Sequence, residues 1–232
     1  MLQSWIRWGA RGLLLTLTVS LIGCGGGKGA DDWHGGPSEP TPRPNPNPYP
    51  NTNSCSAEGL ARSAQSRYPT VCMLTSSGEI VFELYPSYAP DTVGNFLRLV
   101  ADGFYNRTLV HHVDRDFIFQ AGGYYSGMQE KRSPYAPILS ESNNGLSNLR
   151  GTLAMAWYRD ADHASHQFFV NTVDNRFLDY KNRSEPGYTV FGQVISGLAT
   201  VDAINAVPTY RYSSSDIEPR QEVLIYWVQR LK

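Results

Sequence analysis

Residues 71–103 read VCMLTSSGEIVFELYPSYAPDTVGNFLRLVADG. The first part of this stretch predicts two strands that are joined at a Ser-Ser-Gly turn. In the second strand Ile80, Phe82 and Leu84 alternate with other residues, so they share one face. The chain therefore opens its folded part with a hairpin that has one apolar face.

The second part of the same stretch predicts a helix. Its apolar residues recur at helical spacing, and these are Val93, Phe96, Leu97 and Val100. Asp91 or Thr92 is expected to cap the helix at its amino end, and Gly103 is expected to stop it.

Working outward, the pattern predicts further strands over residues 109–113, 117–120, 151–157, 167–171, 188–195 and 222–230. A second helix is predicted over residues 198–206, before Pro208, while residues 56–68 fit either a short helical turn or a loop. Many strands, two helices and short or glycine-containing connections favour a closed antiparallel barrel. Periodicity alone leaves a barrel and a sandwich open.

The amino-terminal residues 1–23 have the features of a signal peptide. Arg7 and Arg11 precede an apolar run over residues 12–22, which is too short to span a bilayer. The run ends in LIGC, which resembles the bacterial lipoprotein cleavage box and implies that Cys24 receives the lipid. The alternative is an ordinary secretory signal followed by a chance cysteine. We expect a lipid-anchored protein of the bacterial cell envelope, with its folded domain in the periplasm.

Residues 24–53 are predicted to be a tether, because GGPSEPTPRPNPNPYPN alternates proline with polar residues and cannot bury a core. Residues 54–232 then form the folded domain. Two cysteines remain in an exported chain, Cys55 and Cys72. Because an oxidising compartment favours disulfides, we expect these two to be bonded rather than free buried thiols.

The charge pattern and the remaining motifs exclude several classes of function. The formal net charge is −1 and the charges are scattered, so no basic stripe indicates a nucleic-acid partner. His163 and His166 form an H-x-x-H pair, but no acid or cysteine stands at a spacing that completes a zinc set. We interpret both histidines as loop residues, and we expect neither a metal nor a cofactor.

Five segments carry a resemblance to a known family: GFYNRTLVHHV, DFIFQAGG, NNGLSNLRGTLAMA, HQFFVNTVDNRFLD and GYTVFGQVISGLATVDAI. Over residues of about 70–210 the chain resembles the cyclophilins, most closely the bacterial periplasmic kind. The resemblance implies a closed eight-stranded antiparallel barrel that is capped by two helices. It also implies a groove outside the barrel that binds proline-containing segments of unfolded or exported proteins, and peptidyl-prolyl cis-trans isomerase activity without a cofactor. We expect a monomer.

The resemblance assigns the peptide-binding residues one by one. Apolar contacts to the prolyl ring are implied for Phe117, Ile118, Phe169, Phe177, Leu178 and Tyr188. Gln120 and Gln167 match the amides that face the groove, and Gln120 is expected to hydrogen-bond the peptide backbone. Ala156 and Trp157 stand at the strand end that offers main-chain hydrogen bonds. Taken singly, each apolar residue would be read as ordinary core.

The family pattern is Phe-His-Arg-Val where this chain has Val110 to Val113. His112 therefore stands where the resemblance implies a catalytic arginine. An arginine is permanently charged, whereas histidine has an ordinary pKa of about 6.5 and is mostly neutral at pH 7. Exchanging a charged hydrogen bond for a neutral one costs about 1.5–3 kcal/mol, or roughly a ten- to hundredfold loss of rate. We therefore expect a slowed isomerase, and the alternative is a catalytically weak proline-peptide-binding module or chaperone.

Arg115 is the other cation that the sequence offers beside His112. A long guanidinium on this turn has the reach to fold back over the groove. The favoured interpretation is a solvated turn charge that pairs with Asp114 or Asp116.

Overall fold

The structure is a computed structural model, and it describes residues 54–158, 160–213 and 216–232. The expected signal peptide, Cys24 and the expected tether lie outside the described residues. Three α-helices are present in the described part, α1 (Ala57–Gln65), α2 (Pro90–Ala101) and α3 (Leu198–Asn205). The strands are β1 (Thr70–Thr75), β2 (Gly78–Leu84), β3 (Thr108–Asp114), β4 (Ile118–Tyr125), β5 (Gln129–Glu130), β6 (Ile138–Leu139), β7 (Thr152–Tyr158), β8 (Asp160–Asn171), β9 (Val190–Ser196), β10 (Thr209–Ser213), β11 (Asp216–Pro219) and β12 (Val223–Arg230).

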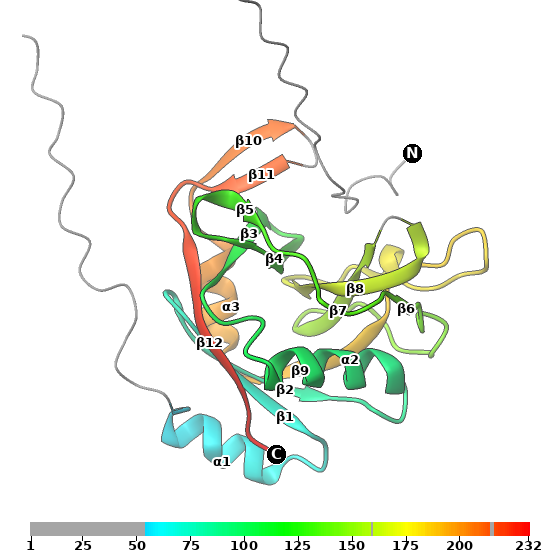
Figure 1. The fold of residues 1–232 in the computed structure, drawn as a ribbon, viewed down its shortest axis with the longest axis horizontal. Helices are drawn as coiled ribbons and strands as arrows, with labels where there is room; N and C mark the ends of the chain where they lie inside the picture. Colours follow the sequence, from blue (N-terminus) through cyan, green and yellow to red (C-terminus); the bar gives the residue numbers. More distant parts are fainter. Residues whose placement is uncertain (1–53, 159, 214–215) are drawn as a thin grey trace, which may run out of the picture. The chain divides into compact units, whose positions relative to one another are not determined.

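Eight of these strands close into a barrel, in the order β4-β3-β12-β1-β2-β9-β7-β8 (Figure 1). Every neighbouring pair is antiparallel, and the pairing of β8 with β4 completes the ring. The short strands β5 and β6 extend the sheet beside β4 and β8. The expected closed eight-stranded barrel is thus confirmed, and the sandwich that periodicity left open is excluded.

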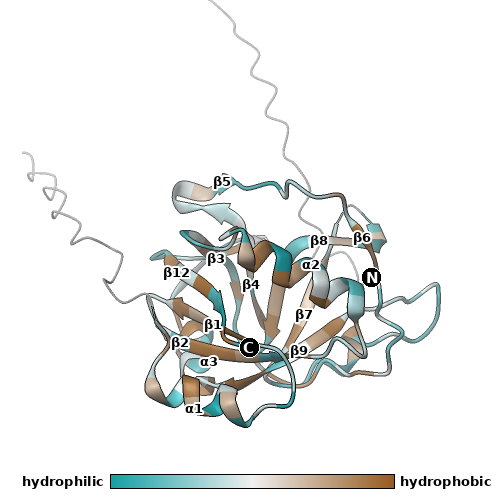
Figure 2. Cartoon of the chain, turned by 60° about the horizontal axis from the view of Figure 1, so that its bottom comes forward, coloured by the Kyte–Doolittle hydropathy of each residue, from teal (hydrophilic) through white to brown (hydrophobic). Residues whose placement is uncertain are grey.

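Alternation along the strands fills the barrel with apolar side chains. One row across four strands illustrates this, because Val113, Phe119, Val170 and Leu153 are consecutive cross-strand partners and all are buried in the largest apolar cluster. Paired residues in a sheet point to the same face, so the row lies inside the barrel. Figure 2 shows the hydrophobic residues concentrated on the barrel strands, while much of the connecting loops is hydrophilic.

The helices α2 and α3 bury apolar residues in the same core. Phe96 and Leu99 of α2 are almost fully buried in it, as are Val201 and Ile204 of α3. These are the two capping helices that were expected, because each has an apolar stripe that needs cover.

The predicted cap of α2 is wrong. The helix begins at Pro90, and neither Asp91 nor Thr92 caps it with its own side chain. The Glu141 carboxylate accepts from the backbone N–H of Asp91 at 3.1 Å and of Thr92 at 2.8 Å, and from the Thr92 hydroxyl at 2.7 Å. A carboxylate from a distant loop therefore satisfies the free N–H groups of the first turn.

Residues 57–65, where helix and loop were both open, form the helix α1. The Ser56 hydroxyl caps it by accepting from Gly59 N at 3.0 Å. A disulfide joins Cys55 to Cys72, with their Cα atoms 6.1 Å apart. The expected bridge is therefore present. It attaches the start of α1 to the first barrel strand, and both cysteines are buried beside Val81 and Trp227.

Two features of the chain differ from the sequence expectation. His163 and His166 are not loop residues, because β8 begins at Asp160 and includes both. A hairpin of β10 and β11 was not expected, since the residues of β10 are largely exposed and show no apolar alternation. It packs against β3.

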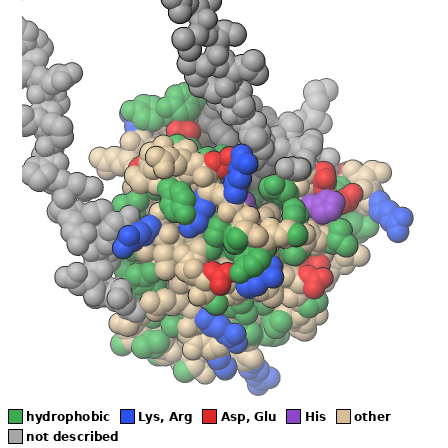
Figure 3. Space-filling view, in the orientation of Figure 1, with side chains coloured by type: hydrophobic (Ala, Val, Ile, Leu, Met, Phe, Trp, Pro, Cys, Tyr) green, Lys and Arg blue, Asp and Glu red, His purple; other side chains and the backbone are tan. Residues whose placement is uncertain are grey.

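The surface carries mixed charge on the face shown in Figure 3, where acidic and basic side chains are interspersed rather than gathered by sign. Within the described ranges, none of the helices combines the length and the apolar character that crossing a bilayer requires.

Removing the disulfide should destabilise the domain. For a bridge with a sequence separation of 17 residues, loop-closure entropy predicts a loss of about 3 kcal/mol in the free energy of unfolding for C55A/C72A. Urea unfolding without a reductant measures this difference in the free energy of unfolding between the natural protein and the double variant. A reductant should lower the unfolding midpoint of the natural protein and leave that of the double variant unchanged, and an unaffected natural protein would contradict the expectation.

Candidate active site

A row of cross-strand partners runs over the outer face of the barrel. His112 on β3 pairs with Gln120 on β4, Gln120 pairs with Phe169 on β8, and Phe169 pairs with Ala154 on β7. Apart from His111, the neighbours of these residues along each strand lie in the barrel core, so the row faces outward. Strand pairing thus brings His112, Gln120 and Phe169 together from distant parts of the sequence.

A register shift in β3 between Val110 and His112 makes this placement possible. Val110 and Val113 both lie in the barrel core although they are three positions apart. Strict alternation would put them on opposite faces, and the irregularity allows both to point inward while His112 points outward.

An apolar cluster that is separate from the barrel core covers the adjoining part of this face. We call it the outer apolar cluster, and its buried members are Ile118, Ala154, Ala156, Phe169, Leu178, Tyr188 and Val190, with Phe117, Leu146 and Trp157 partly buried against them. Seven residues to which the resemblance assigned peptide contacts are among them: Phe117, Ile118, Ala156, Trp157, Phe169, Leu178 and Tyr188. Packing thus separates these residues from the ordinary core.

Aromatic rings dominate the outer apolar cluster. The Trp157 and Tyr188 rings stack with centroids 4.3 Å apart, and Phe169 meets Tyr188 edge-on at 5.4 Å. The Trp157 Nε1–H donates to Gly187 O at 2.7 Å, which orients the indole. Phe177 lies outside the cluster, 52% exposed, and its ring stacks on Phe117 at 5.7 Å. The cluster is therefore a packed aromatic layer, and its partly exposed rings Phe117 and Trp157, with the exposed Phe177, are the ones that reach solvent.

Leu178 and Tyr188 are brought together by the loop between them. Tyr188 N donates to Leu178 O at 2.9 Å, so the two ends of the loop lie next to each other. At Gly187, where φ is +60°, a Cβ atom would lie 2.5 Å from Leu178 O, and only glycine permits this close return.

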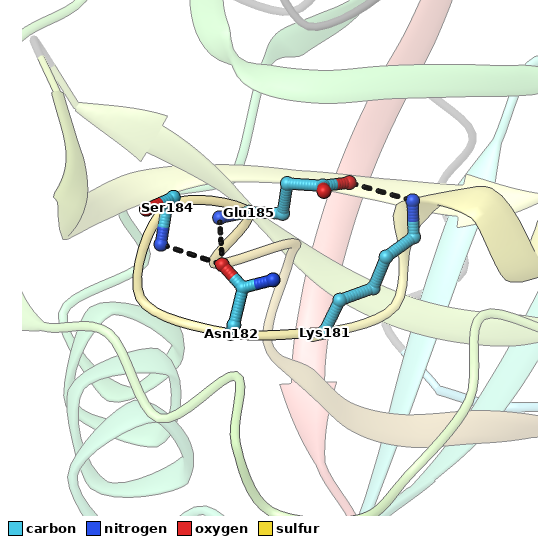
Figure 4. A network of polar contacts seen from close by, with 4 residues as sticks. All are labelled: Lys181, Asn182, Ser184 and Glu185. Carbon is cyan, nitrogen blue, oxygen red and sulfur yellow. Dashed lines mark hydrogen bonds and ion pairs between the residues drawn. The ribbon is translucent and has the colours of Figure 1, made fainter.

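A polar network holds the tip of the same loop (Figure 4). Asn182 Oδ1 accepts from the backbone N–H groups of Ser184 at 2.8 Å and Glu185 at 3.0 Å. Lys181 Nζ pairs with Glu185 Oε2 at 2.7 Å. These contacts give the exposed turn a defined shape, which in turn positions the two cluster residues at its base.

The two glutamines lie side by side next to Phe169. Gln120 Nε2 donates to Gln167 Oε1 at 2.7 Å, and Gln120 is buried. Sequence reasoning expected Gln120 to bind a peptide, and in the free protein Gln167 satisfies one of its donors instead. Gly123 is part of this arrangement, because a Cβ there would lie 2.4 Å from Gln167 Nε2. This bond does not use Gln120 Oε1, whereas the Gln167 side chain also interacts with His111.

His112 is partly buried and holds no charge at neutral pH. Burial lowers the pKa of His112 to about 4; the Asp114 carboxylate opposes this shift, and the Arg211 guanidinium adds to it. Burial also lowers the pKa of the neighbouring His111 to about 3 and that of His166 to about 4. The imidazole at position 112 is therefore a neutral donor or acceptor over the physiological range.

The expected pairing of Arg115 is wrong. Its Nη2 donates to Ala206 O at 3.1 Å, at the end of α3, and not to Asp114 or Asp116. Asp114 instead pairs with Arg211 of β10, whose Nη2 lies 2.9 Å from Asp114 Oδ1. Sequence reasoning missed Arg211 because no local pattern connects the β10–β11 hairpin with β3.

The assembled site offers the partly exposed aromatic surface of Phe117, Trp157 and Phe177, two primary amides and a neutral imidazole. Such a surface suits an uncharged apolar ring, because it gains from removing apolar area from water. The amides suit a peptide group, which needs both a donor and an acceptor. The chemistry available is therefore binding and polarisation of a peptide bond.

Comparison with known proteins identifies the family and the fold. Residues 70–229 match the family model described as "Cyclophilin type peptidyl-prolyl cis-trans isomerase/CLD". The chain is 45% identical over 172 residues to a peptidyl-prolyl cis-trans isomerase of Acinetobacter baylyi, covering 74% of this chain and 90% of the relative. It is 43% identical over 153 residues to peptidyl-prolyl cis-trans isomerase B of Escherichia coli, covering 65% of this chain and 93% of the relative.

Similar solved structures belong to the same family. A cyclophilin-type peptidyl-prolyl cis-trans isomerase of Cryptosporidium parvum superposes with a TM-score of 0.60 at 26% identity, covering 70% of this chain and 97% of that one. A second structure of that protein, determined in the presence of the dipeptide Ala-Pro, gives a TM-score of 0.59 at 27% identity, with 69% and 98% covered.

The three histidines with lowered pKa values predict that acid destabilises the domain. Unfolded histidine takes up a proton near pH 6.5, whereas His111, His112 and His166 take one up only near pH 3 to 4 in the folded state. The unfolded state thus binds more protons below pH 6.5, and each histidine lowers the free energy of unfolding by up to about 1.4 kcal/mol per pH unit there.

Urea unfolding at pH 7 and at pH 5 measures this loss. The variant H166Q should lose less stability between these two pH values than the natural protein does. A free energy of unfolding that is equal at both pH values would contradict the assignment.

Proposed function

The chain belongs to the cyclophilin-type peptidyl-prolyl cis-trans isomerases, and from this premise we propose that it assists the folding of exported proteins at the bacterial cell envelope, at a rate reduced by His112. The observation that carries the proposal is the outer apolar cluster next to Gln120 and Gln167. The isomerase class follows from the family. The clients, the location and the reduced rate are the parts that we propose.

The reaction is rotation about the peptide bond that precedes proline. Amide resonance imposes a barrier of about 18–20 kcal/mol, and no bond to the enzyme is needed to lower it. We infer that the prolyl ring lies against Phe117, Phe169 and Leu178, because all three belong to the outer apolar cluster and Phe117 is partly exposed. Gln120 and Gln167 would hold the neighbouring peptide groups while the bond turns.

Catalysis further needs a donor that acts only in the twisted state. As resonance is lost, the prolyl nitrogen gains a lone pair, and a hydrogen bond made at that moment lowers the barrier selectively. His112 is next to Gln120 in the row and would provide a neutral N–H. Such a bond is weaker than one from a cation by about 1.5–3 kcal/mol, which is the basis of the reduced rate.

The location is supported by two features. LIGC at residues 21–24 fits lipid attachment at Cys24, after which residues 24–53 would tether the domain. The Cys55–Cys72 disulfide is consistent with an oxidising compartment such as the periplasm. We propose a lipid-anchored monomer whose domain meets exported chains after they cross the membrane.

A second function is favoured by one observation, the neutral state of His112. With a weak donor the same surface would bind proline-containing segments without speeding their rotation, as a chaperone or a binding module does. Binding needs only the outer apolar cluster and the amides, whereas turnover also needs the donor.

Replacing His112 with arginine should speed isomerisation. We expect H112R to raise kcat/KM for a proline-containing tetrapeptide by about tenfold, because a charged donor replaces a neutral one. A protease-coupled assay on the full-length chain in detergent measures it. H163R is the matched control, because His163 lies exposed on β8 beside Asp160, outside the outer apolar cluster, and its activity should equal that of the natural protein.

The same assay separates the two functions. A natural protein that binds the tetrapeptide but turns it over no faster than buffer would reject the isomerase in favour of the binding module. Activity between pH 5.5 and 8 should be level, because His112 stays neutral there. A rise as the pH falls through 6.5 would instead identify a protonated imidazole as the donor.

Lipid attachment is tested by mass spectrometry of the non-reduced protein from a bacterial host. We expect an amino-terminal lipid-modified cysteine at position 24 and an intact Cys55–Cys72 bridge. The variant C24S should leave the membrane fraction and retain isomerase activity. An unmodified amino terminus at another residue would refute the anchor.

A further inference from the structure

A second cation lies next to the outer face of the site, on an element that the sequence did not predict. Arg211 is on β10, in the hairpin that packs against β3. Its Nη2 is 2.9 Å from Asp114 Oδ1, and the two side chains are 55% and 22% exposed. Figure 1 shows the hairpin at the same end of the domain as β3 and β5.

The register of β3 puts this ion pair on the same face as His112. Asp114 is two positions beyond His112, so both point outward, and their Cα partners on β4 are Ile118 and Gln120. Ile118 is a member of the outer apolar cluster. The guanidinium of Arg211 is therefore anchored by Asp114, two residues along β3 from His112, at the edge of the proposed peptide surface.

The electrostatics agree with this placement. The positive charge of Arg211 contributes to lowering the pKa of His112, against the opposing effect of Asp114. A charge that disfavours protonation of His112 must lie near its imidazole. Arg211 and His112 thus occupy one electrostatic environment.

We propose that Arg211 is a catalytic residue of the isomerase, supplying from β10 the permanently charged donor that β3 lacks at position 112. The inference rests on the proposed function, since it concerns the same peptide surface. Asp114 acts as the positioning residue that holds the guanidinium on the outer face.

Guanidinium chemistry suits this role. The group stays charged at every biological pH and carries several N–H donors in a planar fork. Among the described residues Asp114 engages one terminal nitrogen, so other N–H groups are left to approach a peptide. The guanidinium would bind the lone pair of the twisted prolyl nitrogen and so supplement the weak neutral donor His112. Its proton stays on arginine throughout, so no covalent bond is made or broken.

Arg115, the cation nearest in sequence, does not take this place. It donates to Ala206 O at the end of α3, away from the row of His112 and Gln120. An exposed ion pair such as Arg211–Asp114 adds little to stability by itself. Loss of the guanidinium should therefore change catalysis far more than folding.

The experiment compares Arg211 variants in the protease-coupled assay, with the full-length chain in detergent. R211Q should lower kcat about ten- to hundredfold and change KM little, because a charged donor acts in the transition state. R211K, which keeps a charge, should retain more activity than R211Q. R150Q is the matched control, because Arg150 forms a half-exposed pair with Asp202 of α3, and its activity should be unchanged.

Two further readouts exclude a merely structural role. H112R should restore most of the activity that R211Q loses, and its gain should be larger in the R211Q background than in the natural protein, because the two cations substitute for each other. By NMR titration, R211Q should raise the pKa of His112, as removal of a nearby positive charge requires.

The outcomes separate the two proposals. An active natural protein with R211Q of equal kcat overturns the role of Arg211 and leaves the isomerase in place. A natural protein without turnover overturns both. A drop in R211Q that R150Q shares, or that accompanies a lowered unfolding midpoint and is not reversed by H112R, also overturns the role of Arg211.

Discussion

The pairing of β4 with β8 is the constraint on which the rest of this structure depends. It closes the barrel and gives every residue of the two strands an inner or an outer face. Phe119 and Val170 therefore enter the core, while Gln120 and Phe169, one position away from them, enter the site. Core residues and candidate-site residues alternate along the same strands, so a shift of one residue in register would exchange the two sets.

Charge in the site is governed by burial. Three histidines near it are kept neutral because the barrel wall removes water from their rings. A lone imidazole in this position is consequently a poor electrophile, whereas a guanidinium held at the solvent edge keeps its charge without desolvation. This difference explains why a half-exposed arginine on a peripheral hairpin suits the role better than the partly buried histidine in the row.

Local pattern predicted the parts of the fold that bury a regular apolar face. The hairpin of β1 and β2, the stripe of α2 and most barrel strands have such faces, and their bounds agree with the structure within a few residues. Local pattern did not predict the features that depend on contacts between residues far apart in the sequence. Glu141 caps α2 from fifty residues away, His166 belongs to a strand whose first half is largely polar, and β10 with β11 are held by pairing and by β3 rather than by an apolar alternation.

The sequence by itself determined the family, the strand-rich architecture and the absence of arginine at position 112. By resemblance it also predicted the peptide-binding residues. These features are written in residue types and spacing, which need no knowledge of distant contacts. Only the tertiary structure decided that these apolar residues form a cluster of their own, that His112 is neutral, and that Arg211 rather than Arg115 stands beside it. The reason is physical. Burial, pKa values and ion pairs depend on which segments lie next to each other in space, and the closure of the barrel determines which segments do so.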